Sequence, residues 1–222
     1  MNDGAPVRAR NGPGPEFFDS ARRRLRLDVP AALTDPTAQA VRGDLDLDPQ
    51  VWKAAGVSAV KPASVLVPVV DRPVPGVILT QRTADLASHA GQIAFPGGKI
   101  EPGDASPANA ALREAEEEIG LARGLVEPLG YLDLYLTFSG FRILPTVARV
   151  APGYALTLNR FEVSEAFEVP LEFLMQPENH QRRSRDWNGI TRQYYAIPYQ
   201  DRYIWGVTAG ILRNLYERIY RE

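Results

Sequence analysis

A run of acidic residues at the end of one predicted helix is the feature that most constrains this 222-residue chain. The segment from Phe95 to Leu121 reads FPGGKIEPGDASPANAALREAEEEIGL. Ser106 and Pro107 are typical of a helix start and Gly120 of a helix end, so we predict a helix over 107–119. Acidic side chains in its last turn meet the negative end of the helix dipole, where each loses about 0.3 to 1 kcal/mol. Such a local conflict usually marks a functional site.

The predicted helix has two faces. Small and apolar residues at helical spacing form the face that we expect to pack on a sheet: Ala108, Ala111, Leu112, Ala115 and Ile119. Glu114, Glu117 and Glu118 gather on another sector, and Arg113 precedes Glu117 by one helical turn. Three carboxylates repel one another unless a hard divalent cation such as Mg²⁺ or Mn²⁺ binds them. A solvated acidic surface is the alternative, but the glycine-rich loop in front of the helix favours a binding site.

Alternating β-branched segments and helical patterns predict an α/β sandwich with a mixed sheet. We expect strands over 64–70, 76–82, 130–138, 142–150 and 191–199. Helices are expected over 16–27, 107–119 and 208–220, the last capped by Thr208. Residues 1–55 are interpreted as an N-terminal extension, a tail with short helices, and residues 56–222 as one catalytic domain.

Composition limits the classes of function. The formal net charge is −2, which gives no general reason to expect a nucleic acid or a membrane as partner. The absence of cysteine excludes disulfides and thiol nucleophiles, and two histidines make a multi-histidine metal centre improbable. No signal peptide or membrane-spanning pattern is evident, so we expect a cytoplasmic protein with a small-molecule partner. A homodimer is left open.

The glycine-rich loop and the acidic helix resemble the signature of the Nudix hydrolases. The resemblance rests on Gly97 and Gly98, on Asp104, and on the segment REAEEEIGL from Arg113 to Leu121. Asp104 stands where the family usually has Glu, and one extra residue separates it from Arg113. The expected fold is therefore the Nudix-type α/β/α sandwich with a mixed sheet.

A second motif is similar to the coenzyme A pyrophosphatase branch of that family. Leu79, Thr80, Arg82, Gly91 and the segment 95–98 match the branch motif, and the branch shares the longer, Asp-containing signature. Ala87 stands where the motif carries a second Arg. The resemblance implies hydrolysis of coenzyme A or its thioesters to 3′,5′-ADP and a 4′-phosphopantetheine product.

The resemblance also assigns roles to residues. Glu114, Glu117 and Glu118, with the Gly98 carbonyl, would bind Mg²⁺ or Mn²⁺, and Arg113 would orient the acidic side chains. Substrate contacts are expected at Arg82, Phe95, Gly97 and Lys99, although a structural ion pair is an alternative for Arg82. One of the helix acids or a distant acid would act as general base. Among Glu162, Glu165 and Glu168 we choose Glu165, with a purely solvated surface as the alternative.

Other functions remain open at this stage. The enzyme could instead hydrolyse ADP-ribose, a dinucleoside polyphosphate or an oxidised nucleotide. A non-catalytic, nucleotide-binding regulator of the same fold is a further alternative, which the intact Arg113, Glu114, Glu117 and Glu118 disfavour.

Overall fold

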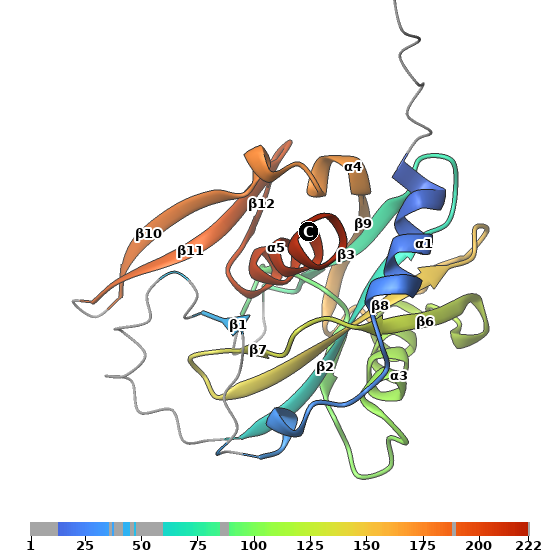
Figure 1. The fold of residues 1–222 in the computed structure, drawn as a ribbon, viewed down its shortest axis with the longest axis horizontal. Coiled ribbons are helices and arrows are strands. Elements are labelled where there is room, and N and C mark those ends of the chain that lie inside the picture. Colours follow the sequence, from blue (N-terminus) through green and yellow to red (C-terminus); the bar gives the residue numbers. More distant parts are fainter. Residues whose placement is uncertain are drawn as a thin grey trace, which may run out of the picture.

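Helices on both faces of a large mixed sheet form the body of the molecule (Figure 1). The computed structural model describes residues 13–35, 37, 42–44, 47, 60–84, 89–187 and 190–221. The predicted α/β sandwich with a mixed sheet is confirmed. None of the helices in these ranges is long and apolar enough to cross a membrane.

The central sheet follows the order β1-β7-β8-β2-β3-β4, with β5 paired to β2, β6 to β8 and β9 to β3. At its centre, β2 and β8 run parallel over ten residue pairs, and β3 joins β2 antiparallel. The strands are β1 (Arg42–Gly43), β2 (Lys61–Val70), β3 (Gly76–Arg82), β4 (Ile93–Ala94), β5 (Gly97–Lys99), β6 (Val126–Tyr131), β7 (Tyr135–Leu136), β8 (Phe141–Val150) and β9 (Val163–Pro170).

The alternation of side chains along β2 explains the two helical layers. Val67 and Val69 face the core beneath α1 (Pro13–Arg24) and α5 (Val207–Tyr220), whereas Leu66 on the other face packs against α3 (Pro107–Ile119). Successive strand residues point to opposite faces of a sheet, so a continuous apolar strand buries both. Among the described residues, α3 is the helix that packs on this face of β2.

The ends of α3 agree with the sequence prediction. The Asn109 amide donates to the Ser106 hydroxyl at 3.2 Å, and Gly120 adopts a left-handed conformation with φ 69°. A Cβ at Gly120 would lie 2.8 Å from the Thr157 amide nitrogen, so both its φ and its surroundings favour glycine.

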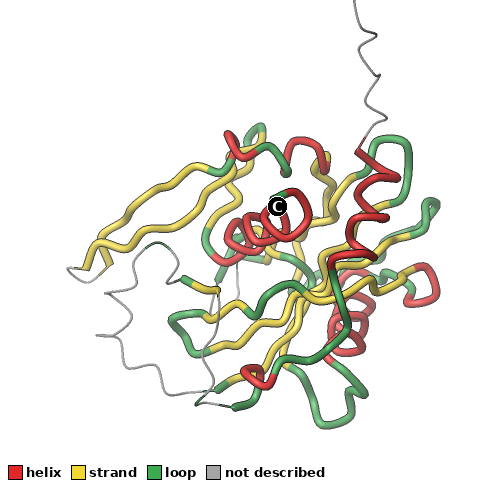
Figure 2. The backbone as a smooth tube through the Cα atoms, viewed as in Figure 1, coloured by secondary structure: helices red, strands yellow, loops and turns green. Residues whose placement is uncertain are grey.

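A second, three-stranded antiparallel sheet follows the central one (Figure 2). It consists of β10 (Gln181–Trp187), β11 (Ile190–Tyr199) and β12 (Arg202–Trp205). The short helix α4 (Leu171–Leu174) precedes it, and 3-10 turns occupy Ala31–Leu33, Arg123–Leu125 and Pro177–Asn179. The sequence prediction found only β11 of these strands.

Three predicted elements need correction. The strand expected over 130–138 is split into β6 and β7, because the backbone turns towards α5, where the Asn214 amide donates to the Asp133 carbonyl at 3.1 Å. Helix α5 starts after Gly206 and not at a Thr208 cap, since the Thr208 hydroxyl donates to the Ile93 carbonyl of β4 at 2.9 Å. The first helix spans Pro13–Arg24, three residues earlier than expected at each end.

The described part of the N-terminal stretch packs with the domain. Phe17 and Phe18 of α1 are buried in the same core cluster as Leu212 and Leu215 of α5. The boundary predicted at residues 55 and 56 lies outside the described residues and stays a prediction.

Candidate active site

Arg113 connects the loop in front of α3 to the acids on the helix. Its Nε and Nη2 atoms each donate to the Asp104 carboxylate at 3.0 Å, and Nη2 also donates to the Lys99 carbonyl at 3.2 Å. Nη1 donates to Glu114 at 3.0 Å and to Glu117 at 3.2 Å. One planar guanidinium thus uses its fixed donors to hold the loop and two carboxylates together.

Glu118 is the most deeply buried acid of the helix, with 4% of its surface exposed. The Gly97 amide donates to its carboxylate at 3.1 Å, and Arg82 Nη1 lies 3.9 Å from its other oxygen. Burial, reinforced by the negative charge of Glu114, raises the pKa of Glu118 to about 7, although the Gly97 amide and Arg82 oppose the change. One amide hydrogen bond and a guanidinium at 3.9 Å do not replace the hydration that the buried Glu118 carboxylate has lost.

Glu114 lies between Arg113 and the backbone of β5. Burial raises the pKa of Glu114 above its usual range, in spite of the hydrogen bond and charge of Arg113. A Cβ on Gly98 would overlap the Glu114 carboxylate, so only glycine allows the backbone to lie this close. Steric contact with Glu114 therefore explains why a glycine occupies position 98.

The donor set fits a hard divalent cation. Glu114 is a partly buried and Glu118 a buried carboxylate, and their charges repel. Glu117 has a half-exposed side chain, and the Glu114 carboxylate fills the space that a Cβ on Gly98 would need. Oxygen donors of this kind suit Mg²⁺ or Mn²⁺. In the described ranges no three His, Cys, Asp or Glu side chains already converge as a metal cage. Arg113 holds Glu114 and Glu117, so their side chains would have to turn to share an ion.

Three of the four predicted substrate contacts lie near α3, and the fourth, Phe95, lies on the other face of the sheet. Arg82, at the end of β3, faces Glu118, and its buried Nε atom lacks a hydrogen-bond partner among the described residues. Gly97 and the exposed Lys99 lie on β5 beside α3. Phe95 is 5% exposed and belongs to the core cluster of α1 and α5, on the opposite face of the sheet from α3. Ala87 lies outside the described residues.

Glu165 lies apart from the acids of α3. Its two carboxylate oxygens accept hydrogen bonds from Arg202 at 2.7 and 2.9 Å, which lowers the pKa of Glu165. Glu162, which we passed over in the sequence, is electrostatically closer, because its charge contributes to raising the pKa of both Glu114 and Glu118. The connection between β8 and β9, residues 151–162, brings Glu162 near the helix, where the Asn159 amide donates to the Glu118 carbonyl at 2.9 Å, and no local pattern predicts that contact.

Comparison with known proteins identifies the family. The model of the NUDIX domain matches residues 60–188, more than half of the chain. The Nudix hydrolase NudL of Escherichia coli strain K12 is 39% identical over 153 residues, which cover 69% of this chain and 80% of that protein. A NudL protein of Shigella boydii serotype 18 matches to the same extent. The chain belongs to the Nudix family, as the sequence motifs predicted.

Solved structures of the family are more distant. The Ap4A hydrolase of C. elegans in a binary complex is 20% identical, with a TM-score of 0.43 over 50% of this chain and 80% of its own. DR0079 from Deinococcus radiodurans is 14% identical, with a TM-score of 0.46 over 83% of this chain and 89% of its own.

Family membership defines the chemistry at a coarse level. The protein is a Nudix hydrolase that acts on a nucleoside-diphosphate-linked small molecule, and members of the family generally use divalent metal ions. The acidic helix and its glycine-rich loop fall within the matched region.

Proposed function

We propose that this Nudix hydrolase cleaves the diphosphate of coenzyme A or its thioesters, giving 3′,5′-ADP and a 4′-phosphopantetheine product. The observation that carries the proposal concerns the segment from Leu79 to Gly98, whose sequence resembles the coenzyme A pyrophosphatase branch. The described parts of this segment form β3, β4 and the start of β5, and they bring Arg82 and Gly97 against Glu118. Arg82, a residue of the branch motif, thus borders the acidic site.

Arg82 is proposed as the ligand of a substrate phosphate. Its Nη1 atom is 3.9 Å from Glu118, too long for a hydrogen bond, and its Nε atom is unpartnered among the described residues. A guanidinium with unused donors suits phosphate oxygens. Lys99, exposed on the neighbouring strand β5, is proposed to add positive charge, and the Gly97 backbone to lie along the substrate. Phe95 is proposed to support this edge from the core rather than by direct contact.

Glu114, Glu117 and Glu118, with the Gly98 carbonyl, would hold Mg²⁺ or Mn²⁺, which supplies charge neutralisation to the diphosphate when bound. Arg113 keeps Glu114 and Glu117 oriented through its pair with Asp104. A water oxygen attacks one phosphorus, the bridging P–O bond breaks, and a carboxylate accepts the proton of the water. Glu162 is proposed for that acceptor in preference to Glu165, whose charge is compensated by Arg202.

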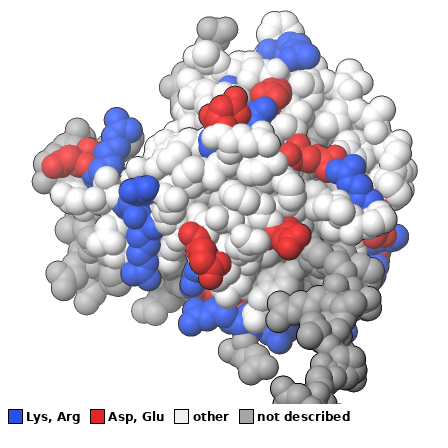
Figure 3. Space-filling view, turned by 90° about the horizontal axis from the view of Figure 1, so that it is seen from above, with Lys and Arg blue, Asp and Glu red and all other residues white. Residues whose placement is uncertain are grey.

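Charge distribution supports a small-molecule substrate rather than a nucleic acid or a membrane, and we retain the cytoplasm as the proposed location. The formal net charge is −2, and on the face seen in Figure 3 positive and negative side chains are interspersed among uncharged ones. A nucleic-acid surface would be expected to gather positive charge. Sedimentation analysis would decide whether the chain forms the homodimer that the sequence leaves open.

A substrate panel tests the proposal. Purified protein is incubated with Mg²⁺ or Mn²⁺ and either coenzyme A, acetyl-coenzyme A, ADP-ribose or a dinucleoside tetraphosphate, and the products are separated by chromatography. We expect 3′,5′-ADP from the two coenzyme A substrates at the highest kcat/KM. If coenzyme A stays intact while ADP-ribose or the dinucleoside tetraphosphate is rapidly hydrolysed, coenzyme A is rejected as the substrate. Hydrolysis of a diphosphate bond then remains the proposed reaction.

Neighbouring glutamates provide a matched pair of variants. Glu117→Gln should reduce turnover by about 100-fold or more, because even outer-shell partners of a catalytic metal typically contribute about 10- to 100-fold. Glu116→Gln is the control, since Glu116 is an exposed side chain that pairs with Arg123 at 2.7 Å. Equal activity of the two variants would remove the basis for a metal site on this helix and reopen the non-catalytic alternative.

A further inference from the structure

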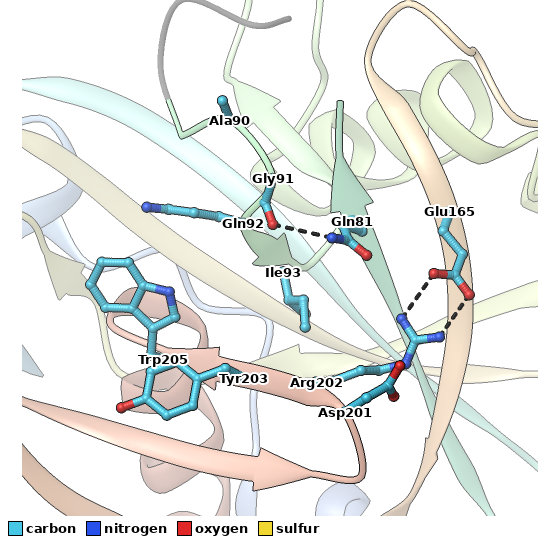
Figure 4. Close-up of a pocket in the computed structure, with 10 residues that line it drawn as sticks. All are labelled: Gln81, Ala90, Gly91, Gln92, Ile93, Glu165, Asp201, Arg202, Tyr203 and Trp205. Carbon is cyan, nitrogen blue, oxygen red and sulfur yellow. Dashed lines mark hydrogen bonds and ion pairs between the residues drawn. The ribbon is translucent and has the colours of Figure 1, made fainter. Parts of the chain in front are cut away.

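A pocket of about 500 Å³ opens beside the end of β3. Its walls come from the end of β3, the start of β4, β9 and β12 (Figure 4). Tyr203 and Trp205 lie at one end of the pocket, and the pair formed by Glu165 and Arg202 lies at the other. None of the helix acids of the metal site lines it.

Arg202 presents a fixed flat surface to this pocket. Both of its terminal nitrogens donate to Glu165, at 2.7 and 2.9 Å, and its guanidinium carbon is 3.7 Å from the centre of the Phe167 ring. Arg202 lines the pocket, whereas Phe167 does not. The ion pair and the aromatic ring together hold the guanidinium plane in one orientation, which leaves its pocket side for a further flat group.

Charge compensation argues against a phosphate at this position. Glu165 occupies both nitrogens of the Arg202 fork, so little net positive charge remains for an anion. An uncharged aromatic ring gains from stacking on a guanidinium without needing that charge. The pocket therefore favours a nucleobase over a phosphate.

One amide side chain offers hydrogen bonds to the edge of such a base. Gln81 Nε2 makes one long hydrogen bond among the described residues, to the Gly91 carbonyl at 3.4 Å, whereas Gln92 points towards the Trp205 end of the pocket (Figure 4). Both glutamines line the pocket. Amides can donate and accept at once, which matches the mixed edge of a purine.

The pocket is connected to the metal site through consecutive residues of β3. Gln81 lines the pocket, whereas Arg82, the next residue, faces Glu118. A register shift between Gln81 and Arg82 marks this strand end. A nucleotide with its base beside Gln81 could thus direct its phosphate around the strand end towards Arg82.

We propose that this pocket binds the purine base of the substrate, stacked on the Arg202 guanidinium, with Gln81 at its edge. Glu165 is then a positioning residue that fixes Arg202, and not the general base expected from the sequence. The inference rests on the proposed function only in requiring a purine nucleotide, and it holds equally for coenzyme A, ADP-ribose or a dinucleoside polyphosphate.

Binding of nucleotide fragments to the full chain tests the pocket without any turnover. Calorimetric titrations in EDTA compare AMP with ribose 5-phosphate, which has the same phosphate and sugar but no base. Wild-type protein should bind AMP about 10-fold more tightly than ribose 5-phosphate, the size of one base-stacking contact. Arg202→Lys keeps the positive charge but removes the flat surface, and it should abolish that preference while leaving the affinity for ribose 5-phosphate unchanged.

Two further variants distinguish a role of Glu165 in positioning Arg202 from a general effect of substitution on the fold. Glu165→Gln should weaken AMP binding and raise KM, with kcat close to that of wild type, whereas loss of a general base would lower kcat. Arg183→Lys is the matched control, because the exposed Arg183 side chain on β10 donates to Gln181 and is not among the residues that line the pocket. Thermal unfolding of each variant checks that the fold is kept.

The outcomes distinguish this inference from the proposed substrate. Equal affinity of wild-type protein for AMP and ribose 5-phosphate, or an undiminished preference for AMP in Arg202→Lys, would overturn the base pocket whatever the enzyme hydrolyses. A preference for AMP that depends on Arg202, together with intact coenzyme A, would keep the pocket and reject only the proposed substrate. A kcat loss without a KM change in Glu165→Gln would overturn the positioning role.

Discussion

The contact between Gly98 and Glu114 allows the acidic site to be perturbed without touching a charged residue. A Cβ added at Gly98 would lie 2.5 Å from Glu114 Cδ, whereas ordinary contacts begin at 3.4 Å. The carboxylate in Gly98→Ala must therefore move by about 1 Å, and a misplacement of that size can reduce catalysis about 100-fold. This corresponds to about 2.7 kcal/mol of transition-state stabilisation.

The fold should survive this substitution, because the obstructing atoms are at the end of a flexible side chain and the Gly98 backbone is not left-handed. We expect the free energy of unfolding of Gly98→Ala to stay within about 1 kcal/mol of wild type, the usual size of a compatible Gly-to-Ala change. The assay is kcat/KM on the best substrate, with chemical denaturation of the same samples.

Gly103→Ala is the matched control, since Gly103 lies in the same loop and its added Cβ would meet nothing within 4 Å. Activity of Gly98→Ala equal to that of Gly103→Ala would refute the placement of Glu114 at the reacting centre. If Gly98→Ala loses much stability and Gly103→Ala does not, the added Cβ displaces the backbone of β5. That result would refute the expectation that the Glu114 carboxylate moves instead.

Four further predictions concern stability and metal dependence. Ser106→Ala removes the hydroxyl that caps α3 and should lower the free energy of unfolding by about 1 kcal/mol in urea denaturation; no change would show that the cap is replaceable. Ile119→Ala empties a fully buried position and should lower it by about 2 to 5 kcal/mol, a larger effect than that of Ser106→Ala. Arg202 lowers the pKa of Glu165 in the folded state, so the pair stabilises the fold above the usual carboxyl pKa of 4.5 and this contribution disappears as the pH falls through the lowered value. The melting temperature of Glu165→Gln should therefore lie below that of wild type at pH 7, and the two should be equal at strongly acidic pH. A difference in melting temperature that persists in acid would show that it does not come from the ion pair. Dialysis against EDTA should abolish turnover, and Mg²⁺ or Mn²⁺ should restore it; activity that survives chelation would argue against a metal ion on α3.

Short-range patterns gave reliable predictions because the interactions behind them span only a few residues. The cap at Ser106, the left-handed Gly120 and the pair of Arg113 with Glu117 all depend on helical spacing. The strand β3 was likewise predicted at its observed bounds, Gly76–Arg82. Thr208 failed as a predicted cap because a tertiary partner, the Ile93 carbonyl, competes for its hydroxyl.

Local sequence patterns predict the helix that carries the acids, the apolar face that docks it and the family to which the chain belongs. The groups that surround those acids are set by contacts between distant segments. Sheet pairing brings the Gly97 amide and Arg82 to Glu118, and it joins Glu165 to Arg202 and not to α3. Such partners are far apart along the chain, and their meeting depends on the register of β3, β5, β9 and β12, which no local periodicity encodes.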